Sequence, residues 1–186
     1  MINKYPHKYS RLLTKKKSLV NYFLIVVLTF YSIGFAPNAF AQIIDSKYFN
    51  WTVYEYQESD FAFKKCYIVS HPISSDSDDN SRKKPYLMIT RYQKNRSEEV
   101  SIFGGYDFKM SSEIFMIIDA FQFHLKAKGD MAWVQSKYED IAIIETMLNG
   151  SAVKIRSDSA HGTYAIDEYS LKGITLAYLR MKEICR

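Results

Sequence analysis

The chain has 186 residues, of which 47% are hydrophobic and 24% charged, with 4 Pro and 7 Gly. This composition suits one ordinary domain with a sizeable core and excludes a disordered chain. The net charge of +5 comes from the first 41 residues, which contain six Lys or Arg and no acidic residue. The remaining 145 residues carry 19 basic and 20 acidic side chains, which excludes the broad basic surface of a nucleic-acid-binding protein.

The first 41 residues have the pattern of a cleaved secretory signal peptide. Three lysines at 15–17 close a positive segment, and a mostly apolar run follows at 22–35. Ala39 and Ala41 then place small residues immediately before Gln42, as signal cleavage requires. An uncleaved membrane anchor is the alternative, but it would need about 20 apolar residues. We therefore expect cleavage after Ala41, export, and contact with the membrane only through the signal peptide.

The two cysteines, Cys66 and Cys185, both lie in the part that would be exported. An even number of cysteines in an oxidising compartment predicts a disulfide. This bridge would close a loop of about 120 residues, which constrains the unfolded chain strongly. Two buried free thiols are the alternative, because a sequence does not show whether the two Cα atoms lie within about 7 Å.

Eight segments after the leader are predicted as strands, because they are rich in β-branched and aromatic residues and are bounded by turn residues. They are 51–57, 66–70, 86–92, 99–105, 114–118, 121–125, 152–156 and 162–170. The polar stretch Ser74–Lys84 is predicted as a solvated loop in which acidic and basic residues neutralise one another. Short strands in irregular succession favour an antiparallel β-sandwich of about seven to nine strands, in one domain at 42–186.

Two short helices are expected beside the sheets. Ser136 with Glu139 three residues later forms a capping-box pattern, and Gly150 marks a helix end, which predicts a helix over 136–149. Its apolar stripe is expected to consist of Tyr138, Ile141, Ile144 and Leu148. A closing helix at 174–185 is predicted from a second stripe, made of Ile174, Ala177, Tyr178, Met181 and Cys185.

No pattern of catalytic, cofactor-binding or metal-binding residues stands out. The series Asp76, Asp78 and Asn80 opens like a calcium loop but lacks the Gly and Glu that such a loop needs later. The histidines of the exported part share no metal spacing, and no nucleophile elbow or glycine-rich phosphate loop occurs. We therefore expect a non-enzymatic protein without catalytic, cofactor or metal residues.

Aromatic residues are abundant in the exported part, which contains 11 Tyr, 8 Phe and 2 Trp. Most of them are expected in the core and in cross-strand pairs. Tyrosines left on the surface would suit a binding face, because Tyr is enriched at protein interfaces.

The order of these landmarks resembles the invasion-associated locus B family, which comprises exported proteins of Gram-negative alphaproteobacteria. The resemblance spans nearly the whole exported part, and both cysteines belong to it. The matching residues are Trp51-Thr52-Val53, Cys66-Tyr67-Ile68-Val69-Ser70, Pro85-Tyr86-Leu87, Glu99-Val100-Ser101, Gly105-Tyr106, Gly129 to Trp133, Met147, Gly150, Gly162-Thr163, Asp167, Tyr169-Ser170-Leu171, Gly173 and Cys185. It implies an immunoglobulin-like β-sandwich in the cell envelope and no catalytic residues.

The best-known members of that family are linked to entry into host cells. The resemblance therefore favours a virulence-associated protein in the periplasm or on the outer-membrane surface, which binds a protein partner in the envelope or on a host cell. The alternative is a periplasmic structural or chaperone-like protein that maintains the envelope without host contact.

Overall fold

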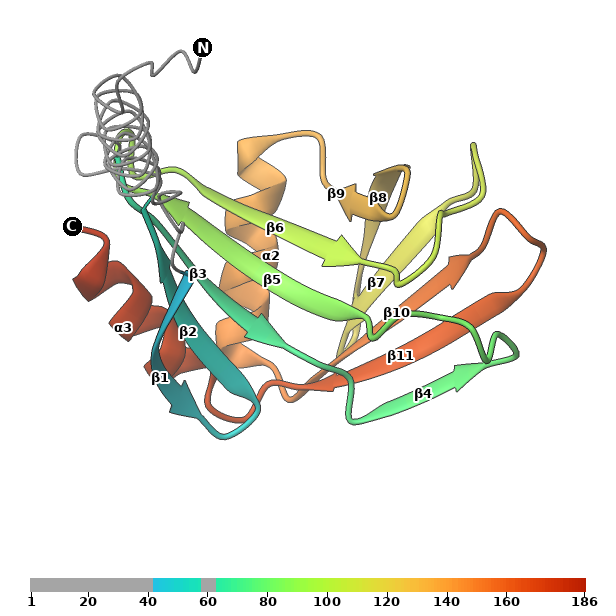
Figure 1. Cartoon of the computed structure of the whole chain (residues 1–186), viewed down its shortest axis with the longest axis horizontal. Helices are drawn as coiled ribbons and strands as arrows, with labels where there is room; N and C mark the ends of the chain where they lie inside the picture. The colour runs from blue at the N-terminus through green and yellow to red at the C-terminus, as the bar shows by residue number, and fades with distance from the viewer. Residues whose placement is uncertain (1–41, 58–62) are drawn as a thin grey trace, which may run out of the picture. The chain divides into compact units, whose positions relative to one another are not determined.

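The computed structural model describes residues 42–57 and 63–186, which all belong to one compact unit (Figure 1). The predicted signal segment, including Ala39 and Ala41, lies outside the described residues, and Gln42 begins the first strand. The elements in chain order are β1 (Gln42–Tyr48), β2 (Trp51–Tyr56), β3 (Lys65–Ser70), β4 (Ser74–Ser77), β5 (Tyr86–Tyr92), β6 (Glu98–Phe103), β7 (Ile114–Ile118), β8 (Phe121–Lys128), β9 (Met131–Trp133), α2 (Lys137–Asn149), β10 (Ala152–Asp158), β11 (Tyr164–Ser170) and α3 (Ile174–Ile184).

All the strands pair in one antiparallel sheet with the order β1-β2-β3-β5-β6-β9-β8-β7-β10-β11-β4. β8 joins two halves of this sheet, because its residues 121–125 pair with β7 and its residues 126–128 pair with β9. We call β1, β2, β3, β5, β6 and β9 the first half-sheet, and β7, β10, β11 and β4 the second half-sheet. Residues 71–73 also connect the halves, since they lead from β3 directly to β4 at the far edge.

The prediction of a mainly β, antiparallel, sandwich-like fold with two short helices is confirmed. The immunoglobulin-like relation implied by the family resemblance stays a prediction. The described residues contain eleven strands rather than seven to nine, because β1, β4 and β9 were not predicted. β9 has only three residues, and β1 and β4 are polar edge strands that hydrogen-bond to one neighbour each, so neither needs a strong apolar pattern.

The core lies between the two half-sheets and under the two helices. Alternate residues of the first half-sheet, such as Val53, Ile68 and Ile89, are fully buried, and so are Met116 and Ile155 of the second. In this core α2 contacts β6, and α3 contacts β1, β2 and β3. The helices therefore cover one face of the first half-sheet, and Figure 1 views that half-sheet from its other face.

The predicted bounds of α2 are confirmed, but the predicted apolar stripe is wrong at Tyr138 and Ile141. The Ser136 Oγ accepts a hydrogen bond from the Glu139 backbone N–H at 3.3 Å, as the capping box requires. The buried side chains of α2 are those of Asp140, Ile143, Ile144 and Met147, whereas Tyr138 is 86% and Ile141 51% exposed. Apolar residues lie on several sides of this helix, so contacts with β6 and α3 select the buried face.

Gly150 ends α2 because a side chain would not fit at this position, not because the backbone needs the conformational freedom of glycine. Its φ of −93° is open to any residue. A Cβ at this position, however, would lie 3.0 Å from the Ile118 Cγ2 atom and 3.0 Å from the Thr146 carbonyl oxygen. The absence of a side chain therefore lets the end of the helix approach β7 closely.

The disulfide between Cys66 and Cys185 is confirmed, and the alternative of two free thiols is wrong. Both residues are fully buried, and their Cα atoms are 5.8 Å apart. Cys66 lies on β3 and Cys185 is the C-cap of α3. The apolar stripe of α3 is also as predicted, since Ile174, Ala177 and Met181 are buried. The bridge therefore holds the last helix against the core face of β3.

Replacing both cysteines by serine is expected to lower the free energy of unfolding substantially. The loop between them spans 119 residues, so the chain-entropy model gives a loss of up to about 4–5 kcal/mol. Urea unfolding of the oxidised wild-type protein and the C66S/C185S variant measures this loss. The reduced wild-type protein is the control and should match the variant; equal stability of oxidised and reduced protein would contradict the prediction.

Two carboxylates of the fold have shifted pKa values of opposite sign. Burial raises the pKa of Asp140 above 3.8, although its carboxylate accepts a hydrogen bond from the Val100 backbone N–H at 2.8 Å. The pKa of Asp45 is lowered, because Arg180 donates hydrogen bonds of 2.7 and 2.8 Å to it. The charged form is therefore disfavoured at Asp140 and favoured at Asp45.

The two shifts predict opposite pH dependences for the matched variants Asp140→Asn and Asp45→Asn. The native Asp140 costs stability once the pH rises through its raised pKa, so Asp140→Asn should gain stability over the wild type from acid to neutral pH. Asp45 stabilises the fold above pH 3.8 and loses this effect as the pH falls through its lowered pKa. Asp45→Asn should therefore be less stable than the wild type at neutral pH and equal to it in strong acid. Denaturant unfolding from pH 3 to 8 checks both; slopes of the same sign would contradict the assignment.

Candidate functional site

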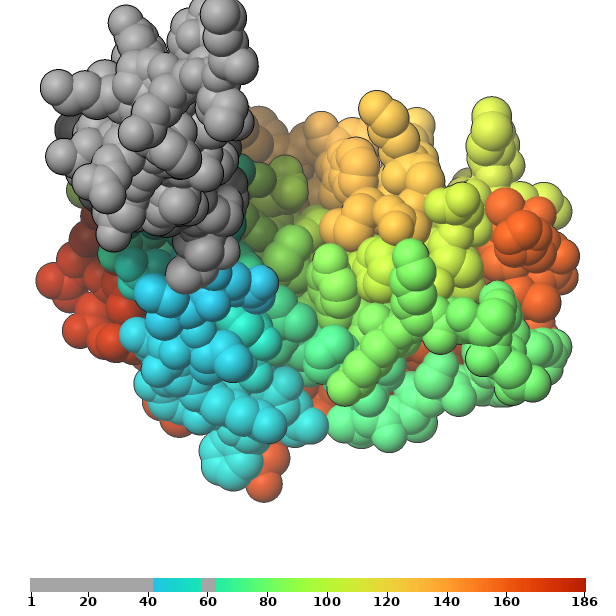
Figure 2. Space-filling model, in the orientation of Figure 1, coloured from blue at the N-terminus to red at the C-terminus, as the bar shows by residue number. Residues whose placement is uncertain are grey.

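The face of the first half-sheet that the helices leave open carries a row of large aromatic side chains. Successive side chains of a strand alternate between the two faces, so Tyr54 and Tyr56 of β2 lie opposite the buried Trp51 and Val53. Together with half-buried residues of neighbouring strands they surround a groove of about 790 Å³. Figure 2 shows this face hollowed between β2 and β3, in cyan and green, and the β8–β9 turn, in orange.

We call this the aromatic groove. Its lining residues are Gln42, Tyr54, Tyr56, Lys65, Tyr67, Val69, His71, Tyr86, Met88, Thr90, Tyr92, Glu99, Ser101, Met131 and Trp133. They come from β1, β2, β3, β5, β6 and β9, together with His71, which directly follows β3. The volume is in the range of ordinary ligand-binding clefts.

The strand register explains why this face is concave. Tyr67 pairs with Tyr54 on one side and with the smaller Thr90 on the other. One row along the strands, Val69 pairs with Met88, which pairs with Ser101, and Ser101 pairs with Trp133. Thr90 and Ser101 therefore lower the middle of the face beside Met88, whereas the rings of Tyr54, Tyr67 and Trp133 stand towards its margins and form aromatic walls.

The walls include two cross-strand ring pairs. The ring centroids of Tyr54 and Tyr67 are 5.2 Å apart with an interplanar angle of 15°, and those of Tyr86 and Phe103 are 5.0 Å apart at 23°. Such stacking holds the rings upright on the sheet. Burial raises the pKa of Tyr67, Tyr86 and Tyr92 above 10.0, so their hydroxyl groups remain protonated across the physiological range.

The floor of the aromatic groove contains a hydroxyl group without a partner. Ser101 is 2% exposed, and its Oγ makes no hydrogen bond within the described part of the chain. Thr90, on the neighbouring strand, is also buried, at 6% exposure. An unsatisfied buried hydroxyl costs about 1–3 kcal/mol, so its presence at the base of an open groove points to a ligand that completes it.

The charges of the groove nearly cancel. Lys65 and Glu99 carry opposite signs, and the Lys65 Nζ lies 5.8 Å from the centroid of the Tyr92 ring. The one other ionisable group besides the tyrosines is His71, whose Nδ1 lies 2.8 Å from the Pro85 carbonyl oxygen. The groove is therefore built for contact with apolar surface and for neutral hydrogen bonds.

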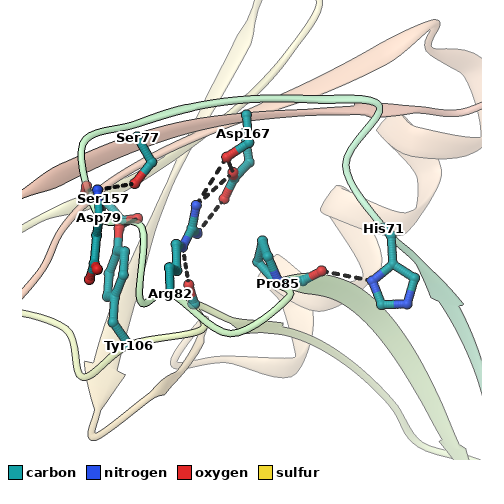
Figure 3. A network of polar contacts seen from close by, with 10 residues as sticks. His71, Ser77, Asp79, Arg82, Pro85, Tyr106, Ser157 and Asp167 are labelled. Atoms are coloured by element: carbon teal, nitrogen blue, oxygen red, sulfur yellow. Dashed lines mark hydrogen bonds and ion pairs between the residues drawn. The ribbon is translucent and has the colours of Figure 1, made fainter.

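A buried ion pair anchors the segment that leads into Tyr86 (Figure 3). Arg82 donates two hydrogen bonds to the Asp167 carboxylate, at 2.9 and 2.6 Å, and a third to the Gly104 carbonyl oxygen at 2.6 Å. The two side chains are only 5% and 1% exposed. Burial disfavours the charge on Arg82, but the hydrogen bonds and the charge of Asp167 outweigh it and raise the pKa of Arg82.

Aromatic and backbone contacts complete this anchor. The guanidinium carbon of Arg82 lies 4.6 Å from the centroid of the Tyr106 ring, and the Tyr106 hydroxyl lies 2.8 Å from the Ser157 Oγ. Gly105 has a φ of +78°, and a Cβ there would collide with the Lys83 carbonyl oxygen. The segment before β5 is thus held between the two half-sheets.

The prediction that Ser74–Lys84 is a solvated loop is wrong at Ser74–Ser77 and at Arg82, whereas Lys83 and Lys84 are exposed as predicted. Residues Ser74–Ser77 form β4, which pairs with β11. Arg82 then turns inward because Asp167 of β11 is buried and needs a cation. The polar and charged composition of a segment indicates that most of it contacts water, but it does not show which side chain points inward. The burial of Arg82 was therefore not predictable from composition.

The predicted site residues fall in separate places. The Cys66–Cys185 disulfide lies on the core side of the first half-sheet, and Gln42, predicted as the first residue after cleavage, lines the aromatic groove. In the described residues, no group of three or more His, Cys, Asp or Glu is placed to hold a metal ion. No helix there is both long and apolar enough to cross a membrane.

The amino-acid composition reveals many tyrosines but does not show that several of them line one groove. A signal was present in β2 and β5, where large apolar or aromatic residues occur in both sets of alternate residues. In β5, Leu87 and Ile89 face the core while Tyr86 and Met88 face the groove. A strand that is apolar on both faces is either covered twice or used for binding.

Comparison of the chain with models of protein families, with curated proteins and with solved structures finds no match.

Replacing Arg82 by Ala is expected to lower the free energy of unfolding by about 3–5 kcal/mol, because the charge of Asp167 would stay buried without a partner. The control is Lys83→Ala at the exposed neighbouring position, where a change within about 0.5 kcal/mol is expected. Denaturant unfolding measures both, and the double variant R82A/D167A should recover part of the loss. The ion pair is not an anchor if Arg82→Ala and Lys83→Ala have equal effects.

Proposed function

We propose that this chain is an exported, non-enzymatic cell-envelope protein that binds a partner through the aromatic groove and supports attachment to host cells or their invasion. The observation that carries the proposal is the groove itself: five tyrosines and Trp133 line an open face of a rigid sheet. Aromatic side chains dominate the energy of binding surfaces, because they bury large area and have few rotatable bonds.

Three features support the cellular part of the proposal. The Ala39-Phe40-Ala41 pattern before Gln42 is typical of signal cleavage. The Cys66–Cys185 disulfide suits an oxidising compartment outside the cytoplasm. The resemblance to the invasion-associated locus B family implies a location in the periplasm or on the outer-membrane surface of a Gram-negative bacterium. It also implies a link to virulence.

A periplasmic structural or chaperone-like protein is the second candidate. Met88 and Met131 favour it, because flexible thioether side chains in the aromatic groove can adapt to apolar segments of many sequences. Such a protein would act on the envelope from within and would not need to reach a host cell.

Complementation of a deletion strain tests the proposal. The strain receives the wild-type chain, the groove variant Tyr67→Ala/Tyr86→Ala, or the control Tyr138→Ala, which removes an exposed tyrosine from α2. Loss of two aromatic anchors is expected to reduce host-cell entry roughly tenfold or more at equal protein level, whereas the control should restore entry fully.

Protease treatment of intact cells separates the two candidates. A surface-exposed protein is digested, whereas a periplasmic protein is protected until the outer membrane is opened. The host-contact proposal fails if the protein is protected, host entry is unchanged in the deletion strain and envelope integrity is reduced. It also fails if the groove variant restores entry as well as the wild type does.

A further inference from the structure

We infer that the aromatic groove binds a neutral glycan, with sugar rings against the tyrosine and tryptophan walls and sugar hydroxyls on the floor. This inference deepens the proposed function and rests on it for the biological role. The binding itself is argued from the chemistry of the lining alone: its charge, its ring faces and its hydroxyl groups.

The charge of the groove fits an uncharged ligand. Lys65 and Glu99 cancel, and Lys65 is further occupied by its position over the Tyr92 ring. Nucleic acids and acidic polysaccharides need clustered Lys and Arg, which this lining does not supply. A partner without net charge is the electrostatic complement of this surface.

The aromatic walls suit the flat faces of sugar rings. Aromatic rings carry negative charge on their faces, which attracts weakly positive C–H groups, and a pyranose presents several C–H groups on each face. The strands that carry Tyr67 and Trp133 are three strand spacings apart, ~14 Å at ~4.8 Å per spacing. Facing walls at this separation leave room for a glycan chain between them.

The floor favours a hydroxylated ligand over a purely hydrocarbon one. Ser101 Oγ has no hydrogen-bond partner in the described residues and lies beside the buried Thr90. The Ser101 Oγ is already withdrawn from solvent in the free protein, so an acyl chain seated on this floor would gain no hydrogen bond there. A sugar hydroxyl reaching the floor would instead complete the missing hydrogen bond.

The hydroxyl groups also favour a glycan over a proline-rich peptide, the other usual occupant of aromatic grooves. Tyrosine, serine and threonine hydroxyls can each both donate and accept hydrogen bonds, as sugar hydroxyls do. A polyproline segment offers carbonyl acceptors and no backbone donors, so it would use only half of this capacity. The lining, with five tyrosines, Thr90 and Ser101, therefore matches a polyhydroxylated ligand better.

Titration of the purified protein, with its disulfide formed, tests the inference. The probes are cellotetraose, maltotetraose, mannotetraose and tetra-N-acetylchitotetraose, with polygalacturonate as the acidic glycan and decaproline as the peptide. Trp133 lines the groove, whereas Trp51 is fully buried and donates a hydrogen bond to the Ser170 carbonyl oxygen at 3.1 Å. Binding of a neutral tetrasaccharide should therefore change Trp133 emission, and calorimetry should give the same affinity. Trp133→Phe should lose the emission change, which assigns that signal to the groove rather than to Trp51.

Ser101→Ala is the variant that tests hydrogen bonding at the floor of the groove most directly. Removing a hydroxyl that has no partner should leave the thermal stability equal to that of the wild type or higher, while weakening glycan binding about fivefold to tenfold. Tyr67→Ala should weaken binding about tenfold or more, and the control Tyr138→Ala should bind as the wild type does. Unchanged affinity in Ser101→Ala and Tyr67→Ala would overturn the assignment of the site.

The inference is overturned if none of the neutral tetrasaccharides binds, or if polygalacturonate or decaproline binds in their place. Binding of decaproline that Tyr67→Ala abolishes would overturn the glycan and leave the groove as a binding site for a protein partner. Failure of the proposed function has a different signature, namely normal host-cell entry with the groove variant Tyr67→Ala/Tyr86→Ala.

Discussion

Successive side chains of a strand point to opposite faces of the sheet, and in β2, β3 and β5 both faces carry large groups. One set, including Val53, Ile68 and Ile89, is buried against the helices and the second half-sheet. The other set forms the aromatic groove. Because α2 and α3 pack on one face only, the same alternation that builds the core also leaves a tyrosine-lined surface in contact with solvent. The same pairing of the strands therefore places the apolar side chains in the core and the tyrosines in the groove.

Two long-range links hold this register at opposite ends of the first half-sheet. The disulfide joins β3 to the end of α3 across 119 residues on the core side. The Arg82–Asp167 ion pair joins the segment before β5 to β11, which belongs to the second half-sheet. Tyr86 begins β5 four residues after Arg82, so the ion pair also sets the position of one groove wall. By contrast, Ser101 keeps a buried hydroxyl that has no partner among the described residues, a local cost to stability of the kind found where a site is shaped for a ligand.

Much of the fold follows from local patterns. The Ser136–Glu139 capping box predicts the start of α2, and the stripe from Ile174 to Cys185 predicts the buried face of α3. The predicted stripe of α2 was wrong in part, since Tyr138 and Ile141 are exposed whereas Ile143 and Met147 are buried. A helix with apolar residues on several sides has no preferred face until a neighbouring strand provides one. β4 was missed for a related reason, because a polar edge strand owes its structure to pairing with β11 rather than to its own residues.

The sequence by itself indicated the class of the fold, the bounds of both helices and the pairing of its two cysteines, because these depend on local periodicity, caps and cysteine count. Only the tertiary structure decided which tyrosines line one groove and that Arg82 is buried against Asp167. It also decided that the Ser101 hydroxyl lies on the floor of that groove without a hydrogen-bond partner among the described residues. Each of these depends on the cross-strand register and on which face the helices cover, and both follow from contacts between residues far apart in the chain. The composition thus indicated that some aromatic residues could form a binding surface, and the packing of the strands showed which residues form it and where it lies.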